Sequence, residues 1–196
     1  MPAFLTDAEL AAVSAAVDRL VPGDDDGFPS ASDAGAPRYI DTLLGAFTFD
    51  PPRIWGGGPF SGRWGGEAAF DAWLPLGTME ELAWRTRIEG SQGLAEREFN
   101  GPVIGLQQRY REGIAALGAD FAEVGAEAQD RRLDADPDFK DLLFTHTCEA
   151  LYGDPVYGGN DGRRVWDAID FVGDIQPRGY TDVEVTQREK TPVREP

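Results

Sequence analysis

Apolar residues recur three or four positions apart along most of the chain, a spacing that predicts a mainly α-helical protein. The first helix is expected to begin at a capping box of Thr6 and Glu9 and to end before Pro22. A second helix is predicted over 40–47, and a third from a Thr78 and Glu81 capping box to about Ile88. A longer helix is expected from Gly101-Pro102 to Gly118, followed by short helical patterns through Phe121 and Val124. The last two helices are predicted from Asp136-Pro137 through Leu151 and over Val165, Ile169 and Val172.

Residues 48–77 follow neither a helical nor an alternating pattern. Glycine and proline prevent long helices there, whereas the interspersed aromatic residues require burial against something. Core packing and stacking on a sugar ring are both open interpretations. We favour a partner interface, because tryptophan, tyrosine and arginine concentrate in protein interfaces. The candidate partner-binding residues in this stretch are Trp55, Phe60, Arg63 and Trp64.

One helical domain is expected to span residues 1–173, with an insertion rich in glycine, proline and aromatic residues at about 48–101. A chain of 196 residues is long enough to bury a substantial core. Residues 174–196 are polar with few apolar anchors, which predicts an extended tail. The predicted fold class is therefore mainly α: an irregular helical domain with an insertion.

The charge balance is strongly acidic, with 35 acidic against 18 basic residues and a net charge of −17. Such a surface repels phosphate backbones, so we expect no nucleic-acid binding. No run of eighteen apolar residues occurs, so direct membrane insertion is not expected. The first residues lack a basic region followed by an apolar one. We therefore expect no leader and a cytoplasmic location for this chain, with export alongside a partner left open.

The usual catalytic motifs are missing from the sequence. It has no Walker loop, no G-x-G-x-x-G between a strand and a helix, and no G-x-S-x-G. The single histidine, His146, and the single cysteine, Cys148, are two positions apart and would face different sides of a helix. We expect a packed histidine and an inert thiol, and no catalytic residue, metal ligand or cofactor in this chain. Carboxylates are numerous, but no spacing singles out an acid–base pair.

The most distinctive pattern begins at Asp154. Pro155 fixes a backbone angle, paired glycines permit a tight or left-handed turn, and Asn160 can cap the next helix. A cap or turn role is expected for Asp154, and Tyr152, Tyr157 and Trp166 are expected to clamp the loop. A rigid loop of this kind could equally dock a partner or simply close the structure between two helices. The candidate partner-binding residues here are Tyr152, Asp154, Pro155, Tyr157, Gly158, Gly159, Asn160 and Trp166.

Residues 147–160, with Trp166 following, resemble the signature of the gluconate 2-dehydrogenase subunit 3 family, also called the gamma or small subunit. The first helix, ending in Asp18-Arg19-Leu20-Val21-Pro22, resembles the family's opening, as do Ala34-Gly35 and Tyr39-Ile40-Asp41 after it. Two substitutions depart from the pattern: Ala150 and Val165 stand where the family usually has glycine. Residues 48–101 are also expanded, so the resemblance is to a divergent member.

The resemblance implies a non-catalytic small subunit that binds, stabilises and helps to mature a large FAD-dependent partner. That partner would be a sugar or alcohol dehydrogenase of the glucose–methanol–choline oxidoreductase type, which carries the flavin itself. Some complexes of this kind add a cytochrome subunit, and some small subunits carry a twin-arginine leader. The residues alone leave other functions open: a stand-alone carbohydrate-binding protein or carboxylate-based enzyme that uses the aromatic insertion, or a maturation chaperone that dissociates.

Overall fold

The computed structural model describes residues 3–56 and 75–171. Within these ranges it contains seven α-helices and no strand, which confirms the mainly α prediction. None of the described helices has the length and hydropathy needed to cross a membrane. The α-helices are α1 (Asp7–Leu20), α2 (Ala36–Leu44), α3 (Thr78–Glu89), α4 (Leu106–Leu117), α5 (Ala126–Asp134), α6 (Pro137–Tyr152) and α7 (Arg164–Ala168), and the 3-10 helices are η1 (Ala46–Thr48), η2 (Ala95–Arg97), η3 (Pro155–Tyr157) and η4 (Asp161–Arg163).

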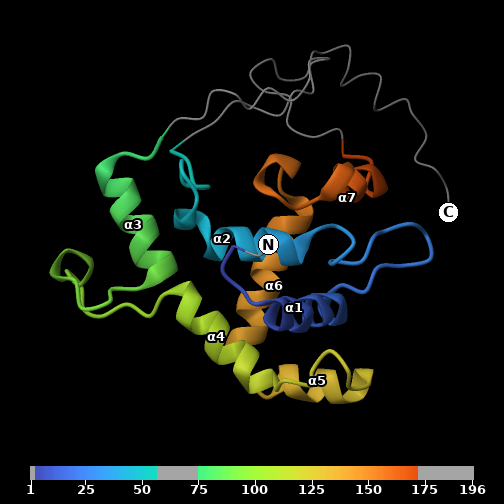
Figure 1. The fold of residues 1–196 in the computed structure, drawn as a ribbon. Coiled ribbons are helices and arrows are strands. Elements are labelled where there is room, and N and C mark those ends of the chain that lie inside the picture. The colour runs from blue at the N-terminus through green and yellow to red at the C-terminus, as the bar shows by residue number, and fades with distance from the viewer. Residues whose placement is uncertain (1–2, 57–74, 172–196) are drawn as a thin grey trace, which may run out of the picture.

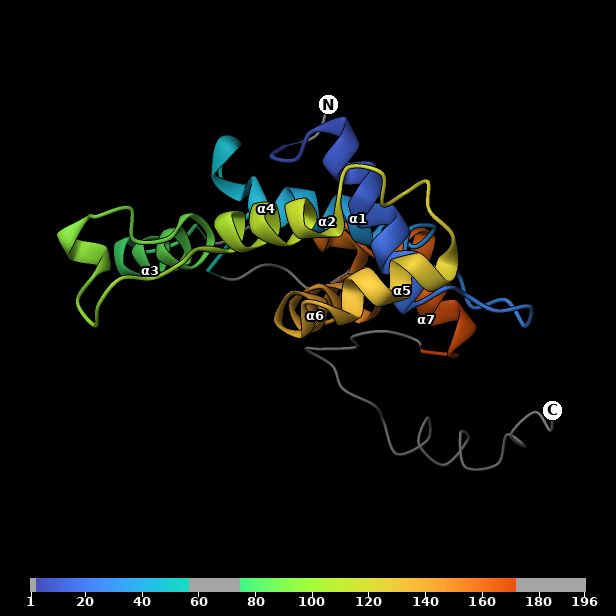
Figure 2. The same ribbon diagram turned by 90° about the horizontal axis from the view of Figure 1, so that it is seen from below.

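Helix α6 is the central element, and α1, α2, α4 and α5 all pack against it (Figure 1). Helix α3 packs mainly on α4. Together with the loop that follows, α3 projects away from the other helices, as Figure 2 shows. We refer to residues 78–105 as the α3 arm. The molecule therefore has a packed helical body and one projecting arm.

The core is built from the apolar faces of these amphipathic helices. Val13, Ile40 and Leu143 are fully buried, and the Tyr110 ring meets the Phe139 ring edge to face at 5.5 Å. Each such side chain contributes about 1.5–3 kcal/mol through burial. Gly113 lets α4 and α6 approach closely, because a Cβ there would lie 2.2 Å from the Phe139 ring.

Two helices begin at other residues than the sequence predicted. The Glu80 carboxylate accepts a hydrogen bond from the Gly77 backbone N–H at 2.8 Å, so α3 is capped one residue earlier than the expected Thr78–Glu81 box. Helix α4 begins at Leu106 rather than near 101, because the Val103 backbone is already paired. Its carbonyl accepts from the Ser91 N–H at 3.0 Å, and its N–H donates to the Ser91 hydroxyl.

Helix α5 was not predicted, because it is polar and carries few apolar residues. Its Gln129 side chain donates to the Phe121 carbonyl oxygen at 2.9 Å, and Leu133 is buried. A two-pronged ion pair of 2.9 and 2.7 Å joins Asp130 to Arg19 on α1. Tertiary contacts thus stabilise α5 in place of an apolar stripe.

The remaining sequence-based expectations concern element ends. Phe47 lies in η1 rather than in α2, and α7 ends before Ile169. Val172 and the predicted tail over 174–196 lie outside the described residues, so the domain boundaries stay predictions.

Asp41 on α2 fixes the segment that leads into α1. Its buried carboxylate accepts hydrogen bonds from the backbone N–H groups of Ala3, Phe4 and Leu5, the last two at 2.9 and 2.8 Å. The predicted capping box follows directly: Glu9 accepts from the Thr6 N–H at 2.7 Å, and the Thr6 hydroxyl accepts from the Glu9 N–H at 3.2 Å. A buried carboxylate is tolerated here because backbone donors replace its water.

Replacing this carboxylate is expected to destabilise the fold. Asp41→Ala should lower the free energy of unfolding by at least about 2 kcal/mol, because a hydrogen bond to a charged group contributes about 1.5–3 kcal/mol. Urea unfolding followed by circular dichroism measures this. Exposed Asp33→Ala is the matched control and should change stability by less than about 0.5 kcal/mol. Equal midpoints for the two variants would contradict the assigned role.

Candidate docking site

Asn160 organises the loop between α6 and α7. Its side chain is fully buried, and its backbone is left-handed, with φ of 47°. The side-chain N–H donates to the Gly153 carbonyl oxygen at 3.3 Å, and the side-chain oxygen accepts from the Val165 N–H at 3.0 Å. The second bond reaches the first turn of α7, although Arg163 and not Asn160 is the N-cap residue of that helix. One amide therefore joins the end of α6 to the start of α7.

The two glycines before Asn160 have different tasks. Gly158 is left-handed, with φ of +100°, a conformation that favours glycine. Gly159 lies against the last turn of α6, where a Cβ would come 2.3 Å from the Ala150 carbonyl oxygen. The Asp154 carboxylate accepts from the Val156 N–H at 3.1 Å and caps η3, whose first residue is Pro155. The left-handed backbone of Gly158 and the close approach of Gly159 to α6 together fix the turn.

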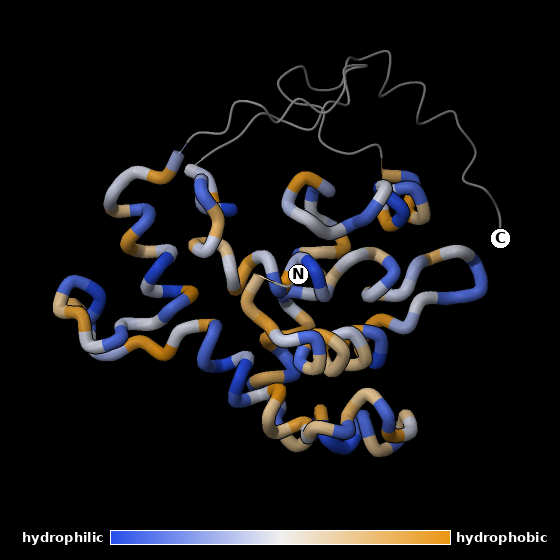
Figure 3. The backbone as a smooth tube through the Cα atoms, viewed as in Figure 1, coloured by the Kyte–Doolittle hydropathy of each residue, from blue (hydrophilic) through white to orange (hydrophobic). Residues whose placement is uncertain are grey.

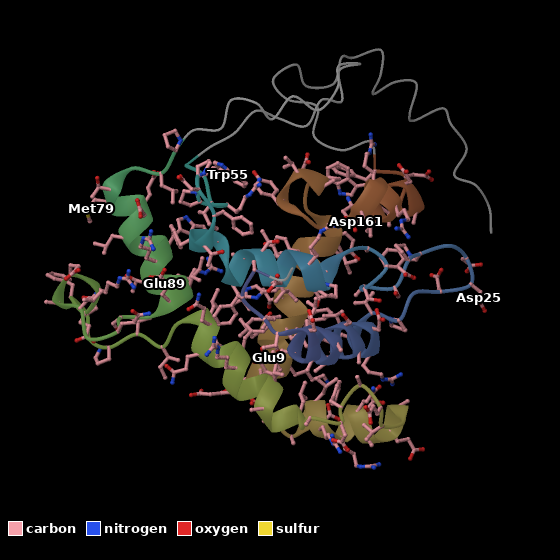
Figure 4. All side chains as sticks on the ribbon, in the orientation of Figure 1. Glu9, Asp25, Trp55, Met79, Glu89 and Asp161 are labelled. Atoms are coloured by element: carbon pink, nitrogen blue, oxygen red, sulfur yellow. The ribbon has the colours of Figure 1, made fainter. Side chains whose placement is uncertain are left out.

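The loop is also fastened to the start of α2. Arg38 donates to the Gly158 carbonyl oxygen at 3.0 Å and forms an ion pair with Asp161. The Asp161 N–H donates to the Ala34 carbonyl oxygen at 3.0 Å. Gly35 leaves the space for the Asp161 carboxylate, because a Cβ there would lie 2.6 Å from it. Asp161 and this contact with α2 can be located in Figure 4.

Trp166 clamps the loop onto the end of α6. Its ring is buried, and its indole N–H donates to the Tyr152 carbonyl oxygen at 2.9 Å. Tyr152 and Tyr157 were expected to clamp as well, but their side chains are 51% and 48% exposed.

The loop carries Tyr157 to the rim of a hollow of about 340 Å³. The Trp55 ring lies beside Tyr157, with centroids 6.4 Å apart and planes tilted by 53°. Trp55 can be located in Figure 4 near the top of α3. We call this the aromatic hollow, and its main lining residues are Tyr39, Arg53, Ile54, Trp55, Trp84 and Tyr157. The hollow thus unites the two segments that the sequence singled out, together with α2 and α3.

The phenols of the hollow are held in their neutral form. The Tyr39 hydroxyl donates to a Glu149 carboxylate oxygen at 3.0 Å. Burial first, and then the negative charge of Glu149, raise the pKa of Tyr39 well above its ordinary value. Burial, and then Asp154, raise the pKa of Tyr157 as well. Both phenols therefore keep their protons at neutral pH, and Tyr39 donates its proton to the Glu149 hydrogen bond.

Most of the predicted docking residues divide into three sets, whereas Tyr152, half-exposed at the end of α6, does not line the aromatic hollow. Trp55 and Tyr157 come together at the aromatic hollow, whereas Asp154, Pro155, Gly158, Gly159, Asn160 and Trp166 shape the loop behind it. Phe60, Arg63 and Trp64 lie outside the described residues. Sequence reasoning missed Tyr39 and Trp84 as lining residues, since helical spacing alone does not distinguish them from core residues.

His146 and Cys148 are arranged as the sequence predicted. His146 is buried, and its Nδ1 lies 2.9 Å from the Tyr110 hydroxyl. Burial lowers the pKa of His146 and raises that of Cys148. The imidazole is therefore neutral and the thiol protonated near pH 7, which leaves neither poised as an acid–base or nucleophilic group.

The α3 arm exposes several large apolar side chains. Figure 3 shows hydrophobic positions along this arm. The exposed residues are Met79, Leu94, Phe99, Val103 and Ile104. Large apolar groups gathered on one projecting element are typical of an interaction surface.

A family model described as gluconate 2-dehydrogenase subunit 3 matches residues 7–173, which is most of the chain. The match includes the Asn160 loop, Trp55 and α3. No curated protein and no solved structure matches the chain.

A small side chain at position 159 should disturb the loop. Gly159→Ala is expected to lower the free energy of unfolding by about 1–3 kcal/mol, because its methyl group forces a backbone shift against Ala150. Thermal unfolding and near-UV circular dichroism measure the loss. Gly125→Ala is the control, since a Cβ at position 125 meets nothing within 4 Å. A Gly159→Ala variant as stable as Gly125→Ala would show that the loop does not need this close approach.

Proposed function

The chain belongs to the gluconate 2-dehydrogenase subunit 3 family, and from this membership we propose that it is the non-catalytic small subunit of a dehydrogenase complex. In this proposal it binds and stabilises a larger catalytic subunit and helps that subunit to mature. The partner carries FAD, is of the glucose–methanol–choline oxidoreductase type and oxidises a sugar or an alcohol. A cytochrome subunit that accepts the electrons would complete some such assemblies.

The observation that carries the proposal is the aromatic hollow. Trp55 and Tyr157 are about 100 positions apart in the sequence, yet they meet at one half-exposed site that is braced from behind by the Asn160 loop. Aromatic residues in a preformed hollow are the usual anchors of protein interfaces, because they bury a large area at low entropic cost. The hollow is of a size to receive one or two side chains of a partner.

The docking surface extends from the hollow along the α3 arm. Trp84 lines the hollow from α3, and Met79, five residues earlier on the same helix, is exposed. Figure 4 shows Met79 at the outer end of α3. A partner that covered both the hollow and the arm would remove these apolar groups from water. Stable subunit interfaces commonly bury about 2,000 Å² or more, which a contact over both surfaces could supply.

The protonation states of the described groups suit a binding role. Tyr39 and Tyr157 keep their protons at neutral pH, and His146 is a neutral core residue. In this account the electrons and protons of the oxidation are handled by the partner. The contribution of this chain is a rigid surface of fixed shape.

Stand-alone sugar binding is the second candidate, and the aromatic lining of the hollow favours it. Trp55 and Trp84 offer ring faces, and Arg53 offers hydrogen-bond donors. Calorimetric titration of the isolated chain with neutral sugars distinguishes the two functions. Saturable binding that Trp55→Ala abolishes would favour the sugar site over the interface.

Purification from the native source tests the proposed function directly. The tagged chain should elute with one protein in fixed stoichiometry. That protein should bear flavin absorbance and oxidise a sugar or an alcohol with an artificial electron acceptor. A chain that elutes alone, or that turns over such a substrate without a second protein, would contradict the proposal.

Tyr157 is expected to be an anchor of the interface. Tyr157→Ala should weaken the complex by about 30-fold or more, as is typical of residues that contribute 2 kcal/mol to binding. Phe144→Ala is the matched control: its ring is 47% exposed, against 48% for Tyr157, but it does not line the aromatic hollow. Surface plasmon resonance with the purified partner measures both affinities. A similar loss for both variants would remove the hollow from the contact.

A further inference from the structure

A second hollow, of about 430 Å³, lies between α3, α4 and α6. Arg87 from α3, Arg109 from α4 and His146 from α6 line it, and Ile104 and Leu142 form an apolar wall. We call it the arginine hollow. It is separate from the aromatic hollow, with which it shares no lining residue.

The two arginines are notable because the chain is so acidic. Several other arginines pair with carboxylates, for example Arg19 with Asp130 and Arg132 with Asp120. Within the described ranges, neither Arg87 nor Arg109 has a carboxylate within ion-pair distance, despite the net charge of −17. Arg87 instead lies over the Trp84 ring at 5.1 Å. A guanidinium is suited to grip a planar carboxylate with two parallel hydrogen bonds.

His146 supplies a third polar group at the inner end of the hollow. Its side chain is almost completely buried, at 1% exposure, and stacks on the Tyr110 ring at 5.7 Å with an interplanar angle of 4°. The buried Tyr110 hydroxyl hydrogen needs an acceptor, and His146 Nδ1 lies 2.9 Å away. We assign Nδ1 as the acceptor, which places the imidazole hydrogen on Nε2. Nε2 has no hydrogen-bond partner among the described residues, and His146 is one of the residues that line the hollow.

We propose that the arginine hollow binds a carboxylate group, gripped by Arg87 and Arg109 and receiving the inner hydrogen bond from His146 Nε2. Ile104 and Leu142 would cover the aliphatic part of the same ligand. The volume lies in the range of small-molecule sites, so a free organic acid fits. The same chemistry is available from an acidic side chain of a partner protein. That second source rests on the proposed subunit role, whereas the first does not.

The chain itself provides a specific probe, because His146 is its only histidine. A full-length sample labelled with ¹⁵N-histidine gives one imidazole Nε2 signal. Titration with sodium acetate or sodium gluconate should shift that signal saturably, whereas neutral glucose and sodium chloride at equal ionic strength should not. The double variant Arg87→Gln/Arg109→Gln should weaken binding at least tenfold. Arg111→Gln, on α4 but over the Phe4 ring, is the matched control and should bind as the native chain does.

A second arm separates the two sources of the carboxylate. If the organic acids leave the signal unmoved, the signal should shift when the copurified partner binds. Arg87→Gln/Arg109→Gln should then weaken that complex at least tenfold, while Arg111→Gln does not. The proposal is overturned if neither organic acids nor a partner moves the signal, or if the double variant binds as well as Arg111→Gln. The first arm uses the isolated chain, so failure to find a partner does not affect its result.

Discussion

The buried amide of Asn160 is the contact on which the shape of the proposed docking site depends. It supplies a donor to Gly153 at the end of α6 and an acceptor to Val165 in α7, in a place that water does not reach. A buried polar group left without a partner costs about 1–3 kcal/mol, so the two bonds hold the loop in one conformation. The close approach of Gly159 to Ala150 and the Trp166 indole bond to Tyr152 add to the same constraint.

The fixed conformation of the loop also sets the position of Tyr157 on the surface. Because the loop is fixed to α6 and, through Arg38 and Asp161, to α2, Tyr157 projects from a rigid base toward Trp55. A preformed site loses little conformational entropy when a partner binds, which is the main advantage of docking through a braced loop. The α3 arm contributes in a different way, since it presents exposed apolar side chains on a projecting element. The proposed subunit role joins these two surfaces into one interface.

Interactions between residues close together in the chain could be predicted from the sequence, whereas contacts between distant segments could not. The Thr6–Glu9 capping box, the left-handed turn at Gly158 and the cap role of Asp154 depend on neighbouring residues alone. The start of α4 was missed because Val103 pairs with Ser91, twelve positions away. Helix α5 was missed because an ion pair from α1 stabilises it in place of an apolar stripe. The aromatic hollow forms where α2, α3 and the loop meet, so no sequence pattern marked Tyr39 and Trp84 as lining residues.

In the proposed complex, segments distant in sequence bind the catalytic partner as one surface. Amide hydrogen exchange, measured on the full chain alone and in its native complex, tests this proposal. We expect peptides covering 53–56 and 154–158 to gain protection together when the partner binds. If both segments exchange at unchanged rates in the complex, while protection appears elsewhere on the chain, the aromatic hollow is not the docking site.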